Sequence, residues 1–108
     1  MAKLEKELDG NFEEILKKIE EGILKGSITA TLEDKSDFVC GKSKCSVRVF
    51  ERYSSLGSNR VSLSITLFQN NEEKIHLSAI TSGGSQALFW KVNTIGEKTF
   101  LNKLKEII

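Results

Sequence analysis

Residues 61–67, Val-Ser-Leu-Ser-Ile-Thr-Leu, decide how this chain folds. Large apolar residues alternate with serine and threonine over the whole stretch. Because successive side chains of a strand point to opposite faces of a sheet, this pattern predicts a strand with one buried and one wet face. The same period of two recurs at residues 28–33, 47–50 and 75–80. The sequence therefore predicts an antiparallel sheet with one apolar face.

Four turns set a register for this predicted sheet, at residues 34–36, 41–44, 55–57 and 70–72. Gly57 suits the left-handed position that a three-residue hairpin loop requires. The turns align one apolar row, which contains Leu32, Phe38, Val47, Ile65 and Leu77. A second row contains Ala30, Cys40, Cys45, Leu67 and Ile75. We expect Val49 to lie beside Leu63 on the buried face, since a slip of one residue would turn a strand's apolar set outward.

Helices are predicted at both ends of the chain. Apolar residues recur every three or four positions over residues 3–24, and Gly26 suits a helix end. Asn11 followed by Glu14 resembles a capping box, which allows the first turns to form a separate short helix. Thr94 and Glu97 have the same spacing before a last amphipathic helix, whose apolar stripe is Phe100, Leu101, Leu104, Ile107 and Ile108.

Together these elements predict a two-layer α+β fold in a single domain, residues 1–108. An antiparallel meander of five to six strands lies under an N-terminal and a C-terminal helix, both packed on its apolar face. The sixth strand would come from residues 87–92, pairing back on the fifth.

Composition is that of an ordinary globular domain, with 39% hydrophobic and 29% charged residues in a chain of 108. Sixteen basic residues against 15 acidic ones leave a net charge of +1, so whole-molecule charge indicates no partner. The N-terminus has no apolar signal segment, and no apolar run reaches the ~18 residues of a membrane span. We expect a cytoplasmic protein that does not bind membranes.

Positive charge gathers in the middle of the chain, at Lys42, Lys44, Arg48, Arg52 and Arg60. Such a cluster can meet a nucleic-acid backbone. It can equally face the acidic N-terminal helix. We prefer the second interpretation, because the aromatic residues that interleave with basic ones in RNA-binding strands are missing.

Three features of the sequence are candidate chemical sites. Cys40 and Cys45 form half a zinc site, completed only if two copies share it, and we expect two buried, reduced thiols close together. His76 is the single histidine, and no acidic residue is placed to orient its ring, so we expect no catalysis. Gly83, Gly84 and Ser85 form a weak candidate for an anion-binding loop, since the phosphate-loop spacing is absent. No cofactor or metal is expected.

The strongest candidate site is a break in polar alternation on the wet face, at residues 76–90. Phe50 and Ile80 fall on that face in the predicted register. If residues 87–92 form a strand, Leu88 and Trp90 join them, and Arg48 and Arg52 flank the patch. A contiguous apolar patch with a polar rim is typical of an interface. The alternative is a register shifted by one, which would bury Leu88 and Trp90 and expose Phe89.

The segments ERYSS (51–55), NRVSLSI (59–65), HLSAITSGGSQALFW (76–90) and IGEKTFL (95–101) resemble a small family of uncharacterised bacterial proteins, mostly from Gram-positive species. The resemblance spans most of the chain. It implies a small cytoplasmic bacterial protein, and it carries over no catalytic residue.

We therefore expect a non-enzymatic binding or assembly module that uses the open sheet face, either as a homodimer or with a small protein partner. The alternative is a carrier for a small apolar ligand, held in a cavity between the long helix and the sheet. An enzyme is the third class, disfavoured by the single histidine and the lack of paired carboxylates.

Overall fold

The computed structural model describes residues 1–53, 59–83 and 101–108. The elements are β1 (Ala2–Leu8), α1 (Phe12–Gly26), β2 (Thr31–Cys40), β3 (Ser43–Tyr53), β4 (Arg60–Gln69) and β5 (Ile75–Gly83). A C-terminal helix covers residues 101–107.

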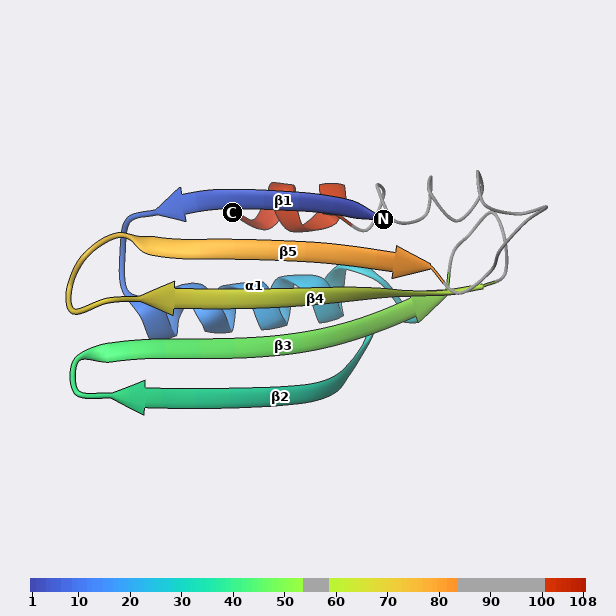
Figure 1. Ribbon diagram of the computed structural model, residues 1–108. Helices are drawn as coiled ribbons and strands as arrows, with labels where there is room; N and C mark the ends of the chain where they lie inside the picture. The colour runs from blue at the N-terminus through green and yellow to red at the C-terminus, as the bar shows by residue number, and fades with distance from the viewer. Residues whose placement is uncertain (54–58, 84–100) are drawn as a thin grey trace.

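One sheet contains all five strands, in the order β1-β5-β4-β3-β2, and every neighbouring pair is antiparallel. The chain starts at one edge, crosses beneath the sheet as α1, and returns as a meander from β2 to β5 (Figure 1). Both helices lie on the same side of the sheet, which leaves the opposite side open within the described residues (Figure 1). The predicted two-layer α+β fold is confirmed.

The N-terminus was wrongly predicted. Residues 2–8 form β1 beside β5, and α1 begins only at Phe12. The error arises because Leu4 and Leu8 fit either a helical face or alternate positions of a strand. Asn11 is the true start signal, since its Oδ1 accepts the backbone N–H of Glu14 at 2.9 Å. Gly10, with φ of +135°, supplies the sharp change of direction before it.

The predicted turn at residues 34–36 is also wrong. Residues 31–40 form one continuous strand, and a bulge between Leu32 and Asp34 takes up an extra residue. Two predicted strands therefore merge into β2, while β1 keeps the described sheet at five strands. Residues 87–92, predicted as a sixth strand, lie outside the described residues.

Two registers differ from prediction, with unequal consequences. Ile65 pairs with Ala79 rather than Leu77, a shift of two residues that keeps each side chain on its predicted face. Leu63 pairs with Phe50 rather than Val49, a shift of one residue that reverses β3. Phe50 is consequently buried, with no exposed surface, while Val49 lies on the open face.

The core lies between the helices and the sheet. Ile19 and Ile23 of α1 are 0% and 1% exposed, and Ile65 at the sheet centre is 1% exposed, as predicted. The C-terminal helix adds its predicted stripe, with Leu101 and Leu104 both buried. The remaining buried apolar side chains are Phe12, Phe50, Val61, Leu63, Leu67, Ile75, Leu77 and Ala79.

The two helices approach each other closely at Gly22. A Cβ atom at this position would lie 2.6 Å from Cδ1 of Ile107, which is closer than van der Waals contact allows. A glycine in mid-helix costs about 1 kcal/mol relative to alanine. Here its missing side chain lets the C-terminal helix settle against α1.

Candidate binding surface: the open face of the sheet

The open face is the side of the sheet opposite the helices, and its side chains come from all five strands. The pairings place these side chains in cross-sheet rows. One row contains Lys3, Ile80, Ser64, Val49 and Asp34. The next contains Glu5, Ser78, Thr66, Val47 and Ser36. Small polar residues fill the middle of both rows.

The third row runs from Glu7 to Phe38 and is the most apolar. We call its four residues on β5 to β2 the aromatic row: His76, Phe68, Cys45 and Phe38. Phe38 is 65% exposed and Phe68 is 41% exposed. The rings of Phe68 and His76 lie 6.4 Å apart, tilted by 36°. Large apolar side chains this exposed, gathered in one row, are typical of a contact surface.

Ile80 lies on the open face with 41% of its surface exposed, between Lys3 and Ser64. The other described residues of the predicted patch lie elsewhere. Phe50 is buried, Arg48 is only 5% exposed, and Arg52 shares their helix-facing side of β3. Placing Phe50, Arg48 and Arg52 on the open face was therefore wrong. The cause is the one-residue shift in the register of β3.

Several predicted site residues lie outside the described residues, namely Leu88, Trp90, Gly84 and Ser85. Gly83 is the last residue of β5, where it pairs with Val61. Both the wider interface patch and the anion-binding loop stay predictions.

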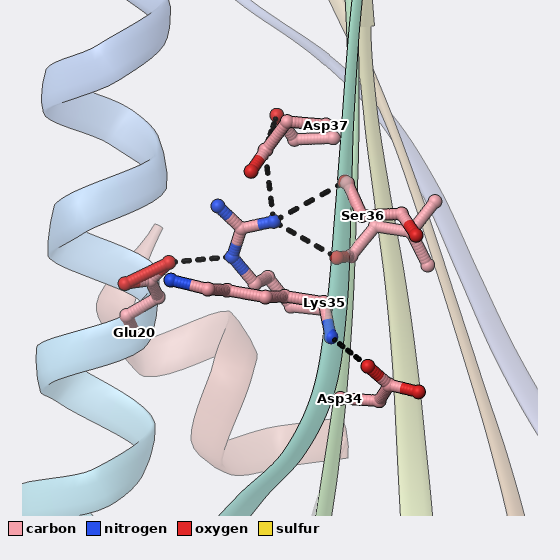
Figure 2. A network of polar contacts seen from close by, with 8 residues as sticks. Glu20, Asp34, Lys35, Ser36 and Asp37 are labelled. Atoms are coloured by element: carbon pink, nitrogen blue, oxygen red, sulfur yellow. Dashed lines mark hydrogen bonds and ion pairs between the residues drawn. The ribbon is translucent and has the colours of Figure 1, made fainter.

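Arg48 belongs to a polar cluster on the covered side of the sheet, together with Glu20 and Asp37, which are labelled in Figure 2. Its Nε donates to Oε1 of Glu20 on α1 at 2.6 Å, and its Nη1 lies 2.9 Å from Oδ1 of Asp37 on β2. Nη1 also donates to the backbone carbonyls of Ser36 and Val47, at 3.3 and 2.9 Å. The guanidinium thus joins α1, β2 and β3.

Charge in this cluster is well matched. Burial opposes the positive charge of Arg48, but hydrogen bonds to Glu20 and Asp37 outweigh burial and raise its pKa. The hydroxyl of Ser46, which donates to Asp37 at 2.6 Å, and then Arg48 hold the pKa of Asp37 below its usual value. Because its charges are satisfied internally, we interpret this cluster as structural.

Other basic residues of the middle segment are also engaged. Lys44 pairs with Glu13 of α1, and Arg60 pairs with Glu51 at 2.6 Å. Together with the pair between Arg48 and Glu20, these contacts fit the predicted arrangement in which the acidic helix faces basic residues of the sheet.

A shallow depression of about 360 Å³ surrounds His76 on the open face. Its walls include Glu5, Glu7, Thr66, Phe68 and Ser78. The expectation that no acidic residue approaches His76 was wrong, because β1 places Glu7 directly opposite it. Within the described residues, no hydrogen bond connects the side chain of His76 to Glu7 or to Ser78. The arrangement therefore offers a polar hollow rather than an assembled proton relay.

The cysteines are not placed as predicted. Cys40 pairs with Ser43 and Cys45 with Phe38, so the two thiols are not directly opposite each other. The reason is a tight turn at Gly41, whose φ is +60°. Both thiols are free; Cys40 is exposed and Cys45 is half-buried, contrary to the expected burial. Among the described residues, no group of three or more histidine, cysteine or acidic side chains could hold a metal ion.

In the parts of the chain described, no helix has both the length and the apolar character needed to cross a membrane. Fold and surface together define a small two-layer α+β domain with one sheet face that the described residues leave uncovered. Residues 1–108 match a family of unknown function, DUF6054, and the chain belongs to that family. No curated protein matches the chain.

Sequence reasoning missed Phe38 and Phe68 as candidate surface residues. Phe68 continues the series Ser62, Ser64 and Thr66, so the alternation of β4 alone places it on the open face. Phe38 was wrongly placed in the buried row beside Val47. It pairs with Cys45 and lies on the open face, because the register of β3 is shifted by one residue.

Proposed function

We propose that this protein is a non-enzymatic binding or assembly module that uses the open face of its sheet. The observation that supports this most is the aromatic row, in which Phe38 and Phe68 are 65% and 41% exposed. Aromatic side chains supply much of the contact energy in interface cores. The serine and threonine residues around the row can form the polar part of such a contact.

The extent of this surface favours a macromolecular partner. The open face has side chains from all five strands, whereas the depression around His76 includes only Phe68 and His76 of the aromatic row. A macromolecular partner can cover the aromatic row and Ile80 together. The simplest partner is a second copy of the chain, and a small protein is the other candidate.

The carrier alternative has less support. Ile19 and Ile23 are fully buried against the sheet, and Phe12 is 4% exposed at the start of the same helix. The space in which an apolar ligand would bind is thus occupied by side chains of α1. Nucleic-acid binding also lacks support, because Lys44, Arg48 and Arg60 already pair with acidic residues.

A cytoplasmic location and an origin in Gram-positive bacteria belong to the same proposal. They come from the sequence and its resemblance alone.

The test is a charge placed on the open face. Phe68→Glu and Ile80→Glu should leave the fold intact, because both positions are 41% exposed. Each should weaken self-association, since it places a charge in a patch that loses water on contact. Sedimentation velocity over a range of protein concentrations gives the dissociation constant, and circular dichroism checks the fold.

Leu24→Glu is the matched control. Leu24 is a large apolar residue with 39% exposure, but it lies on α1, on the other side of the molecule. It should leave association unchanged. If the wild-type protein stays monomeric at millimolar concentration, the homodimer is excluded. Binding assays with purified candidate proteins would then test a small protein partner.

A further inference from the structure

We propose that a second copy of this chain pairs with the edge of β2, antiparallel and centred on Ser36. This contact goes beyond the proposed function, because it uses the edge of the sheet and leaves the open face uncovered. The sheet order places β2 at one edge and β1 at the other. An edge strand presents unpaired backbone groups to which another strand can bind.

The two edges differ in length and in polarity. β1 has seven residues, and four of them are charged: Lys3, Glu5, Lys6 and Glu7. β2 has ten residues, of which Glu33, Asp34, Lys35 and Asp37 are also charged, but it ends in an apolar stretch, where Phe38 is 65% and Val39 is 72% exposed. Charge protects an edge strand from pairing, so the second half of β2 is the less protected edge.

The direction of the backbone groups in β2 follows from two contacts. Arg48 Nη1 binds the carbonyls of both Ser36 and Val47, so these carbonyls point into the space between β2 and β3. Backbone groups alternate in direction along a strand, so those of Lys35 and Asp37 point outward. Consistently, the Lys35 N–H is bound by the side chain of Asp34, at 2.8 Å, rather than by β3 (Figure 2).

Charge then favours Ser36 over its two neighbours as the centre of a symmetric pair. In a two-fold antiparallel pair, Lys35 and Asp37 would exchange backbone hydrogen bonds with their equivalents in the second copy. Centring on Ser36 places each Lys35 opposite the other copy's Asp37. Centring on Lys35 or on Asp37 would instead place like charges in contact, which is destabilising. The sequence of β2 is thus complementary to itself around Ser36.

One contact opposes this pairing and makes it easier to test. The Asp34 carboxylate occupies the outward N–H of Lys35, which the second copy would need. Asp34 thus competes with association, as does the bulge between Leu32 and Asp34. If pairing occurs, the two open faces join into one surface twice as wide, and the exposed Phe38 of each copy lies near the joint.

Cysteine cross-linking tests the register. In a pair centred on Ser36, the two Ser36 residues form a non-hydrogen-bonded pair with Cα atoms about 4.5 Å apart. That separation lies within the range of a disulfide. Ser36→Cys, in a Cys40→Ser, Cys45→Ser background, should form a covalent dimer under mild oxidation, as seen on non-reducing gels and by intact mass.

Leu24→Cys in the same background is the control, because Leu24 is exposed on α1, away from both the edge and the open face. Edge pairing predicts at least about tenfold faster cross-linking at residue 36 than at residue 24, and equal rates would overturn it. Ser64→Cys, in the middle of the open face, reports the contact of the proposed function separately. Failure of the edge and failure of the proposed function are therefore distinguishable.

Charge variants test the same contact without cysteine chemistry. Lys35→Asp places two acidic residues opposite each other at both symmetric positions, and should raise the dimer dissociation constant by about tenfold or more. Lys6→Asp, on the opposite edge, should leave it unchanged. Asp34→Ala should lower it severalfold, because it frees the Lys35 N–H. An unchanged constant in both Lys35→Asp and Asp34→Ala would exclude the proposed register.

Discussion

Strands β3 and β4 lie side by side and are almost equally long, yet their sequences predict their structures with very different success. In β4, one set of alternate residues is Val61, Leu63, Ile65 and Leu67, and the other set begins with serine and threonine. In β3, Val47 and Val49 alternate with Arg48 and Phe50, so both faces carry apolar residues. Alternation assigns a face only where the second set is polar. In β3 the choice was made by partners that are distant in sequence.

The largest expected difference between the two strands is a core cavity in β4. Ile65→Ala should destabilise the protein by about 2–5 kcal/mol, because Ile65 is 1% exposed at the centre of the sheet. Urea denaturation measures the change. Val47→Ala, in the neighbouring strand, is the control and should cost less than half as much, since Val47 is half-buried on the open face.

The same contrast explains which parts of the fold could be predicted from the sequence. The apolar face of β4 and β5, the C-terminal stripe and the cap at Asn11 were predictable, because each depends on residues close together in the chain. Exposed Ile80 was predictable for the same reason. β1 was not, because its pattern suits a helix until its pairing with β5 is known.

The candidate site was predicted less well than the fold. Arg48 was placed on the open face because the predicted register turned Val47 and Val49 toward the helices. Its burial depends on Glu20, which is 28 positions away, and on Asp37, in a strand that was predicted to be divided. No local pattern reports such a pairing. Phe68, in contrast, can be placed on the open face from the alternation of β4 alone.

Removing the charge of Arg48 tests what fixes the orientation of β3. Arg48→Met keeps much of the side-chain volume but leaves Glu20 and Asp37 without their cation. Leaving polar partners unsatisfied should cost about 1–3 kcal/mol, measured by urea denaturation. Adding Glu20→Gln should recover part of the loss. A change below about 0.5 kcal/mol would instead be typical of an exposed position, as the sequence had suggested.

The acid side of the stability curve should report the same cluster. The pKa of Asp37 is lowered by Ser46 and Arg48, so its charged form stabilises the folded state. That contribution is fully present above the ordinary pKa of 3.8 and is lost as the pH falls through the lower, folded-state pKa.

Asp37→Asn should therefore destabilise the protein at pH 7, by less than about 1 kcal/mol because this carboxylate is half exposed. The difference from wild type should shrink below pH 3.8. Urea denaturation at several pH values measures it. In the Arg48→Met background the pH dependence of the difference should be smaller, and an unchanged dependence would mean that Arg48 does not hold the Asp37 charge.

The smallest expected effect is a Val→Thr change at Val49, compared with the same change at the buried Val61. Val49 and Val61 both lie in alternating strands, but Val61 is 0% exposed and faces the helices, whereas Val49 is half-buried on the open face. Threonine has almost the same shape as valine and an equally good strand propensity, so Val→Thr chiefly adds a hydroxyl. At Val61 that hydroxyl enters the core and should cost about 1–3 kcal/mol. At Val49 it can reach water, and the free energy of unfolding should stay within about 0.5 kcal/mol of wild type.

Thermal and urea denaturation of the two variants would show which face of the sheet each valine occupies. If Val49→Thr cost as much as Val61→Thr, Val49 would be a core residue, and the register of β3 would be the one first expected from the turns.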